Sequence, residues 1–406
     1  MPLIVQKYGG TSVGSLDLIR RVAARVKAAQ ASGTNVVVVV SAMGDSTDRL
    51  VDLARGLCAE PDAREMDVLL STGEQVSMAL LCIALRNQGC EARSYTGSQV
   101  RIVTTGVHSR ARIEKVETER LRADIARGVV PVVAGFQGMD ESGDITTIGR
   151  GGSDTTAVAL AVALEADECQ ILTDVDGVYT TDPRMVPAAR RLDRITFDEM
   201  LELAGQGSRV LHLRSVEFAS KYNVPLRVAA SFGAGPGTLI CREEPRVEAP
   251  VVSGIAFNRD EAEITVAGVP DAPGTAFRLL KPVSDASIEV DMIVLNAARA
   301  GNVDLSFTVH RDDYGPALRL VKEAAAHFAG AQVNGNDRVA KLSVVGVGMR
   351  SHAGVATRLF ETLAAESINV RLVSTSEIKI SVLVDEQALE RGVRCLHAAF
   401  GLERPS

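Results

Sequence analysis

The run NVVVVV at residues 35–40 constrains the fold of this chain more than any other segment. Five consecutive valines favour a β-strand, and a strand without polar alternation must be buried on both faces. Such strands belong to mostly parallel sheets that helices cover on both sides. Similar short apolar runs recur up to about residue 240, and longer helical stretches separate them. The sequence therefore predicts an α/β sandwich over this first region.

The expected elements of the first region alternate along the chain. Strands are predicted at residues 2–7, 35–42, 91–96, 129–135, 169–174, 225–230 and 237–241. Helices are predicted at residues 15–31, 64–88, 111–127, 153–165, 196–204 and 208–222. Ligands of such sheets gather at the carboxyl ends of the strands, and the glycine-rich segments of this chain follow those ends.

The composition is that of an ordinary globular protein, with 46% hydrophobic and 23% charged residues. A net charge of −7 and the absence of a long basic run argue against a nucleic-acid partner. Six scattered cysteines without a CxxC pair suit a reducing compartment. No apolar stretch is long enough to span a bilayer and no signal peptide is recognisable. We therefore expect a soluble cytoplasmic protein that binds neither nucleic acid nor membrane.

The C-terminal region contains an internal repeat. Residues 271–291 align without gaps with residues 351–371, and seven of the 21 positions are identical. Strand-like runs flank both copies, which predicts two βαββ units. Chance similarity between two amphipathic helices is the alternative, and the shared flanks argue against it. The charged, proline-punctuated residues 241–251 indicate a linker before the repeats.

The segment VQKYGGTSVG at residues 5–14 is the first candidate for chemistry. Gly9 and Gly10 permit positive φ and close backbone approach, so their amides could face a bound anion. The helix expected after them would direct its N-terminus at the same anion. The segment is not a P-loop, because its lysine precedes the glycines. A plain strand–turn–helix connection with a solvated Lys7 is the alternative.

Three further segments combine small residues with isolated charges. STGEQ at residues 71–75 carries Glu74, which could also be a simple helix cap. TTIGRGGSDTTA at residues 146–157 offers the Arg150 fork for a carboxylate beside glycine amides. TDVDGVYTTDPR at residues 173–184 places acidic groups at a strand end, although Asp-Gly turn chemistry of a hairpin would explain it too.

Taken together, these segments resemble the aspartate kinases of the amino acid kinase family. The resemblance covers essentially the whole chain and is carried by KYGGTSVG, SAMGDSTD, STGEQ, GFQG, TTIGRGGSDTTA, TDVDGVYTTDPR and FDEMLELA. The two repeats resemble the paired ACT domains of those enzymes, which bind amino acids as regulators. The resemblance implies a three-layer sandwich with a mostly parallel sheet, followed by two βαββ ACT-type α+β domains. It also implies ATP-dependent phosphorylation of the L-aspartate β-carboxylate to 4-phospho-L-aspartate, with Mg²⁺ accompanying ATP.

The resemblance also implies domain boundaries. The expected domains are a catalytic domain at 1–245, a linker and strand at 246–262 that is contributed to the second ACT domain, a first ACT domain at 263–339 and a second at 340–406. A homo-oligomer, dimer or larger, would form through the ACT domains. Lysine and threonine, alone or together, would be the inhibiting effectors of this first step of lysine, threonine and methionine synthesis.

Residue roles follow from the same resemblance. The catalytic residues would be Lys7, Glu74 and Asp154. Aspartate would bind to Thr47, Glu74, Arg150, Gly152 and Ser153, with its α-carboxylate on Arg150 and its ammonium on Glu74. ATP would bind to Lys7, Tyr8, Gly9, Gly10, Thr173, Asp174, Tyr179, Asp182, Arg184 and Arg209. Arg209 departs from the lysine that many relatives carry there. No protein side chains are expected to form a metal site of their own.

The effector sites are expected at equivalent places in the two repeats. In the first repeat they would comprise Asp271, Ala272, Pro273, Gly274, Thr275, Ala276, Glu289, Val290, Asp291 and Leu295. In the second they would comprise Val355, Ala356, Asn369, Val370, Ser376 and Glu377. Leu295 replaces a glutamine that is usual in close relatives, so threonine is expected to bind more weakly here.

Two other functions are compatible with parts of the pattern. One is a kinase of the same fold that acts on glutamate, acetylglutamate or a nucleotide, and the C-terminal repeats argue against it. The other is a catalytically silent amino-acid sensor. The intact Lys7, Glu74, Arg150 and Asp154 argue against that interpretation.

Overall fold

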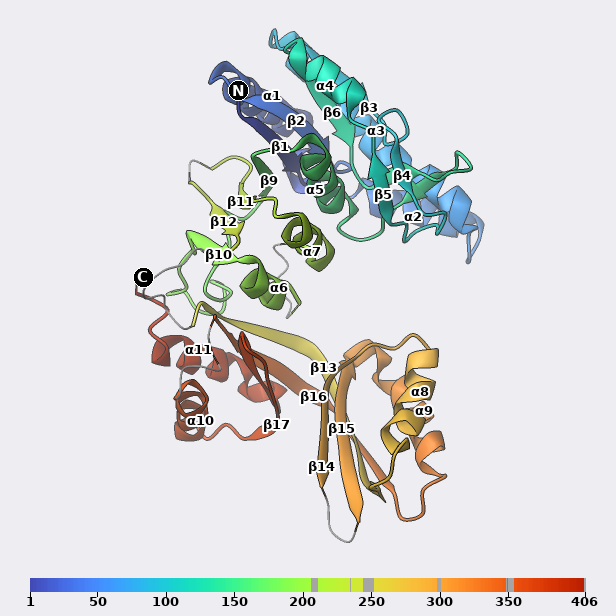
Figure 1. The fold of residues 1–406 in the computed structure, drawn as a ribbon, viewed down its shortest axis with the longest axis vertical. Helices are drawn as coiled ribbons and strands as arrows, with labels where there is room; N and C mark the ends of the chain where they lie inside the picture. The colour runs from blue at the N-terminus through green and yellow to red at the C-terminus, as the bar shows by residue number, and fades with distance from the viewer. Residues whose placement is uncertain are drawn as a thin grey trace. The chain divides into compact units, whose positions relative to one another are not determined.

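A computed structural model describes residues 1–205, 211–233, 235–243, 252–297, 301–347, 349 and 354–404. These residues form two compact units (Figure 1). The first unit comprises residues 1–178, 191–204 and 211–243. The second comprises residues 179–190, residue 205 and the described residues between 252 and 404. A short segment from the middle of the chain thus belongs to the C-terminal unit.

An eight-stranded sheet is the centre of the first unit, in the order β10-β12-β11-β9-β1-β2-β6-β3. Its strands are β1 (Leu3–Tyr8), β2 (Asn35–Val40), β3 (Ala92–Tyr95), β6 (Val130–Ala134), β9 (Glu168–Thr173), β10 (Arg194–Thr196), β11 (Leu226–Ala230) and β12 (Thr238–Cys241). All neighbours are parallel except β11 and β12. The five valines of β2 are buried, as their unbroken run predicts. The predicted mostly parallel sandwich is confirmed.

Helices cover this sheet (Figure 1). They are α1 (Leu16–Ala31), α2 (Ser46–Leu57), α3 (Ala63–Asn87), α4 (Glu119–Ala126), α5 (Gly152–Leu164), α6 (Phe197–Gly205) and α7 (Leu213–Tyr222), with a 3₁₀ turn, η1, at Gly10–Ser12. Side chains of α1 and α3 share one hydrophobic cluster with β1, β2 and β6. Helix α3 is long and apolar enough, by length and composition alone, to cross a membrane. A core helix passes the same test, and α3 packs against the sheet and buries two carboxylates, Asp67 and Glu74.

The prediction of one helix at residues 111–127 is wrong. Residues Ile113–Val116 form strand β5, and the helix α4 begins only at Glu119. Strand β5 belongs to a separate four-stranded sheet, β5-β4-β7-β8, with β4 (Ile102–Thr104), β7 (Gln137–Met139) and β8 (Ile145–Thr147). Strands of three or four residues leave too short a pattern to read, and their β-branched residues find partners that are distant in sequence. Helix α2 was also missed, because it buries none of its residues.

The second unit is built on a six-stranded antiparallel sheet in the order β14-β15-β13-β16-β18-β17. Its strands are β13 (Gly254–Pro270), β14 (Val290–Ala297), β15 (Asn302–His310), β16 (Gln332–Val345), β17 (Val370–Thr375) and β18 (Lys379–Asp385). Its helices are α8 (Thr275–Asp285), α9 (Tyr314–Ala325), α10 (Val355–Ala365) and α11 (Leu389–Ala399), with 3₁₀ turns η2 (Arg311–Asp313) and η3 (Glu386–Ala388). Each repeat therefore supplies a β-strand, a helix, two strands and a second helix.

The long strands β13 and β16 join the two repeats. Gly254 lies opposite Val345 at one end of their ladder, and Ala267 lies opposite Gln332 at the other. The N-terminal part of β13 therefore pairs with the part of β16 that also pairs with β18 of the second repeat. The C-terminal part of β13 pairs with β15 of the first repeat. Because β13 and β16 each extend across the parts of the sheet that belong to both repeats, the boundaries of the two ACT-type domains stay a prediction. Most of the expected linker lies outside the described residues.

Residues 179–190 are built into the second unit next to α11. Met185 and Val186 belong to the hydrophobic cluster that contains Leu396 and the other core residues of the second repeat. Thr180 Oγ1 lies 2.9 Å from Nε2 of the buried His397. The Arg394 Nε donates to the Met185 carbonyl at 3.1 Å. This segment follows β9 in sequence, so the compact units do not coincide with a simple division of the chain near residue 245.

Candidate active site

Lys7 lies near the carboxyl end of β1 and contacts the first turn of α5. Its Nζ is 2.6 Å from Oδ1 of Asp154, and each side chain is 12% exposed. The alternative of a solvated loop lysine is therefore wrong. Asp154 lies in the first turn of α5, which begins at Gly152. The positive end of the helix dipole favours a carboxylate at that position.

The turn after Lys7 requires glycine at position 10, for a different reason from the one predicted. Neither Gly9 nor Gly10 has positive φ. The Gly9 amide donates to the Leu172 carbonyl at 3.2 Å, so it is not free to bind a phosphate. A Cβ on Gly10 would lie only 2.8 Å from the Ala42 carbonyl oxygen. Glycine therefore serves close packing of this turn against the loop that follows β2.

Glu74 lies in the middle of α3, so the helix-cap interpretation is wrong. Its side chain is buried, and Oε1 accepts a hydrogen bond from the Ala42 amide at 3.1 Å. Oε2 is buried and has no partner among the described residues. Burial raises the pKa of Glu74 to about 7, although the Ala42 amide and the charge of Lys7 lower it in part. A buried carboxyl with a spare oxygen is suited to receive a cationic group of a ligand.

The turn between β8 and α5 presents Arg150. Gly149 and Gly151 on either side have φ of 85° and 68°, which an L side chain rarely adopts. A Cβ on Gly151 would also overlap the ring of His212. The Arg150 side chain is exposed, and no ion pair with another described residue holds it. Its guanidinium is therefore free to bind a carboxylate.

The remaining predicted substrate residues also belong to the first unit. Gly152 and Ser153 begin α5, and a Cβ on Gly135 would be 2.7 Å from the Ser153 hydroxyl, so this turn is tightly packed. Thr47 lies in the first turn of α2, which begins at Ser46 after the loop that follows β2.

The predicted nucleotide residues divide between the two units. Thr173 ends β9, the neighbour of β1, and its hydroxyl donates to the Asp174 carboxylate at 2.9 Å. Tyr8 is a core residue whose side chain is fully buried and donates to Gln6 at 3.1 Å, so only its backbone could face a ligand. Three more belong to the second unit: Tyr179, Asp182 and Arg184. Arg209 lies outside the described residues.

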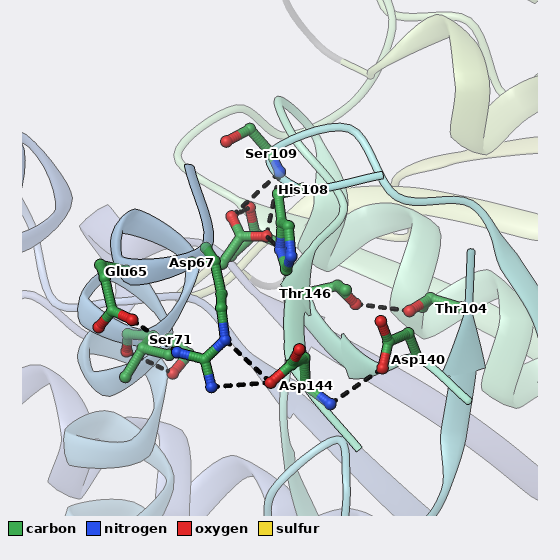
Figure 2. A network of polar contacts seen from close by, with 12 residues as sticks. Glu65, Asp67, Ser71, Thr104, His108, Ser109, Asp140, Asp144 and Thr146 are labelled. Atoms are coloured by element: carbon green, nitrogen blue, oxygen red, sulfur yellow. Dashed lines mark hydrogen bonds and ion pairs between the residues drawn. The ribbon is translucent and has the colours of Figure 1, made fainter. Parts of the chain in front are cut away.

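Three polar residues near the site were missed by the sequence analysis: Asp67, Gln137 and Arg214. Asp67 is fully buried on α3 (Figure 2). The Gln137 amide donates to the Ser71 carbonyl at 2.8 Å, which ties the GFQG segment to α3. Arg214 donates to the carbonyls of Ile148 and Ala111 at 2.9 Å each. The sequence offers little local signal for these residues beyond their polar side chains, and it does not reveal their hydrogen-bond partners.

The predicted effector residues occupy equivalent places in the two repeats. Gly274 and Gly354 precede α8 and α10 with φ of 90° and 110°, so both helices begin alike. The adjacent predicted residues are Asp271, Ala272, Pro273, Thr275 and Ala276 in the first repeat and Val355 and Ala356 in the second; residues 351–353 lie outside the described part. Those near the edge strands β14 and β17 are Glu289, Val290, Asp291, Leu295, Asn369, Val370, Ser376 and Glu377. Asp291 is already paired with Lys341, whereas Leu295 is 53% exposed.

Comparison with known proteins identifies the family. The amino acid kinase family profile matches residues 2–230, and an ACT domain profile matches residues 342–400. An aspartokinase of Pseudomonas aeruginosa is 60% identical over 408 residues, covering 100% of this chain and 99% of the relative. E. coli aspartokinase III in complex with aspartate and ADP (R-state) has a TM-score of 0.80 at 26% identity, covering 98% of this chain and 99% of that one. The same enzyme in complex with lysine and aspartate (T-state) has a TM-score of 0.79 at 26% identity, with the same coverage. This chain belongs to the aspartokinases of the amino acid kinase family.

Proposed function

We propose that this protein transfers the γ-phosphoryl group of ATP to the β-carboxylate of L-aspartate, giving 4-phospho-L-aspartate. The observation that carries the proposal is the Lys7–Asp154 pair, 2.6 Å apart, in the unit that also buries Glu74 and exposes Arg150. The reaction would be the first step of lysine, threonine and methionine synthesis. It would take place in soluble form in the cytoplasm.

The chemistry requires positioning and charge neutralisation more than proton transfer. The β-carboxylate of aspartate is already ionised at neutral pH, so no strong general base is needed. Two anions must be held in line while negative charge spreads over the transferred phosphoryl group. The Lys7 ammonium would neutralise that charge, and Asp154 would hold Lys7 in place. A pair with limited exposure keeps this interaction stronger than it would be in water.

Aspartate would be held at both ends of its backbone. The Arg150 fork would bind the α-carboxylate, because it is exposed and no described carboxylate is paired with it. The free Oε2 of Glu74 would accept the ammonium. Thr47, Gly152 and Ser153 would complete the pocket. The ammonium would bind only the ionised form of Glu74.

ATP would lie at the carboxyl ends of β1 and β9, where Lys7 and Thr173–Asp174 lie on adjacent parallel strands. No group of three or more His, Cys, Asp or Glu side chains within the described residues could hold a metal ion. Mg²⁺ would be held mainly by phosphate oxygens and water, with Asp154 as a candidate carboxylate ligand. When bound, Mg²⁺ would neutralise charge on the nucleotide phosphates.

Regulation and assembly would belong to the second unit. The E. coli relative that was solved with lysine supports lysine as an effector, and threonine is our further proposal. The strands β14 and β17, at the two ends of the hydrogen-bonded order, carry exposed apolar side chains at Ile293, Leu295 and Val373. Unpaired strand edges of this kind favour pairing with another chain. We therefore expect a homo-oligomer that forms through these strands.

A coupled assay of ADP release tests the proposal. The full-length protein is assayed with ATP and Mg²⁺ in the presence of aspartate, of glutamate, or of no acceptor. ADP release that depends on aspartate alone is expected. Release with glutamate but not aspartate would identify a different carboxyl kinase of the same fold. No acceptor-dependent release, together with retained lysine binding, would indicate a silent sensor and would contradict the proposal.

A further inference from the structure

Helix α3 carries a second buried carboxylate two turns before Glu74. Asp67 has no exposed surface, and Figure 2 shows His108 and Ser109 directed at it. The Ser109 amide lies 3.1 and 3.0 Å from its two oxygens, and Nδ1 of His108 lies 2.9 Å from Oδ2. The Thr147 hydroxyl donates to Oδ1 at 2.6 Å. All four contacts come from segments outside α3.

Thr147 connects this carboxylate to the turn that presents Arg150. It is the last residue of β8 and stands three residues before Arg150. Its carbonyl accepts from the Ala111 amide at 3.0 Å. The next carbonyl, that of Ile148, accepts from Arg214 at 2.9 Å. The backbone that leads to Arg150 is thus held by Asp67 through a side chain and by Arg214 through a carbonyl.

The same helix face connects Asp67 to Glu74. Residues seven positions apart lie on one side of an α-helix, two turns from each other. Glu74 and Arg150 are the two groups proposed to hold the ammonium and the α-carboxylate on Cα of aspartate. Asp67 therefore joins the helix that carries one of them to the strand that leads to the other. Of the four contacts, the one with Thr147 reaches the strand that leads to Arg150, and the other three reach His108 and Ser109.

We propose that Asp67 is a positioning residue for aspartate, which acts through Thr147 to set the Arg150 turn relative to Glu74 on α3. This inference rests on the proposed binding roles of Arg150 and Glu74. Asp67 touches neither substrate. Loss of its contact with Thr147 would loosen the spacing between Glu74 and Arg150, the proposed partners of the two charged groups on Cα. Aspartate binding would therefore weaken, whereas ATP binding would stay the same.

Thr147→Val is the central variant, because valine keeps the shape and removes the hydroxyl. A hydrogen bond to a charged group is lost, so we expect the KM for aspartate to rise about tenfold or more. The KM for ATP should change less than about twofold. Thr147→Ser keeps the hydroxyl and should restore near wild-type values. Asp67→Asn, if it folds, should raise the KM for aspartate at least as much as Thr147→Val.

Asp124→Asn is the matched control. Asp124 is equally buried, on α4 of the same unit, and is bonded to the Tyr95 hydroxyl and to Arg93. The hydrogen-bond partners of its carboxylate are Arg93, Tyr95 and Arg127, and none of them lies on α3 or in the Arg150 turn. Its loss should lower the melting temperature and leave the KM for aspartate unchanged. An equal rise of that KM in Asp124→Asn and Thr147→Val would overturn the inference, since general loosening would then explain both.

A double-mutant cycle with Arg150→Ala separates this inference from the proposed function. If Thr147 acts through Arg150, Thr147→Val should have little further effect on the KM for aspartate once Arg150 is removed. A full, additive effect in the Arg150→Ala background would overturn the positioning role while leaving the function intact. A wild-type protein without aspartate-dependent ADP release would instead contradict the proposed function itself.

Discussion

The two units each contain a lysine on a strand that is paired with a carboxylate, and the two lysines differ in their surroundings. In the first unit Lys7 contacts Asp154 at 2.6 Å, with 12% of its side chain exposed. In the second unit Lys341 on β16 contacts Glu261 on β13 at 2.8 Å, with 4% of each side chain exposed. Lys341 also contacts Asp291 on β14. Lys341 therefore has two carboxylate partners, whereas one carboxylate contacts Lys7 within the described residues.

The positions of these carboxylates explain the difference. Glu261 and Lys341 are equivalent residues of the two repeats, 80 positions apart, and so are Asp291 and Arg371. Both equivalent pairs have opposite charges, so one repeat complements the other within a single chain. Lys341 is satisfied by the fold itself. Lys7 lies beside a glycine turn at a strand end and keeps 12% of its side chain exposed, and we propose that an anionic ligand approaches it there. We therefore propose that the lysine–carboxylate pair of the second unit, which is enclosed, stabilises the fold. The more exposed pair of the first unit is proposed to act in catalysis.

Removal of Lys341 should have the largest effect of the changes that test this comparison. Lys341→Ala leaves Glu261 buried without its cation, which costs about 3–5 kcal/mol of unfolding free energy. Urea denaturation of the full-length chain measures the loss. The kcat without effectors should change little. The double variant Lys341→Met with Glu261→Gln should recover most of the loss, because no buried charge is left unpaired. A loss below about 1 kcal/mol in Lys341→Ala would show that the pair is not a structural element.

Removal of Lys7 should act on catalysis. Lys7→Ala is expected to lower kcat by roughly 10²–10³, or about 2.7–4 kcal/mol, because one preorganised positive charge is lost from the transition state. The KM for ATP should change much less. Steady-state kinetics with saturating aspartate measure both. A variant that keeps more than about a third of the wild-type kcat would contradict the catalytic role.

The pH dependence of aspartate binding tests the proposed role of Glu74 in binding the ammonium group of aspartate. Because the pKa of Glu74 is raised to about 7, its ionised fraction rises about tenfold between pH 6 and 8. The KM for aspartate should fall by about the same factor over that range. Lys7→Ala should move the midpoint to higher pH, since the charge of Lys7 lowers this pKa. Glu74→Gln should abolish the dependence, and an unchanged slope in that variant would assign it to another group.

The same shift affects the stability of the free protein in a defined direction. The folded protein holds the Glu74 proton more tightly than the unfolded chain, whose pKa is near 4.5. The contribution of Glu74 to stability therefore falls as pH rises from about 4.5 through about 7. Aspartate should offset this loss above pH 7, which thermal unfolding with and without the amino acid would measure.

The smallest expected effect concerns Leu295 on the edge strand β14. Leu295→Gln adds an amide that could hydrogen-bond an effector, which is worth about 0.5–1.5 kcal/mol. Inhibition by threonine should tighten roughly three- to tenfold, and kcat without effector should stay the same. Ile293→Gln is the matched control, because Ile293 is on the same face of β14 and is 52% exposed. Identical inhibition curves for wild type and Leu295→Gln would remove Leu295 from the effector site.

Much of the fold was readable from local pattern. The valines of β2, the amphipathic α1 and the 80-residue repeat each carry their signal in a short window, because burial and periodicity are local properties of a strand or helix. Lys7, Glu74, Arg150 and Asp154 were recognised as candidates in the same way, from short motifs. The pattern failed where elements were short, as in β5, whose Ile113–Val116 pairs with residues of β4.

The role of each group depended on contacts between distant parts of the chain. The sequence by itself determined that a lysine precedes two glycines, but only the tertiary structure placed that lysine against Asp154. It also decided that Gly10 serves close packing, since the Ala42 carbonyl that excludes a side chain there comes from another loop. The partners of Asp67, and the inclusion of residues 179–190 in the second unit, were likewise decided by packing. Local sequence limits the conformation of each element, whereas burial, pKa and hydrogen-bond partners arise only when the elements are packed together.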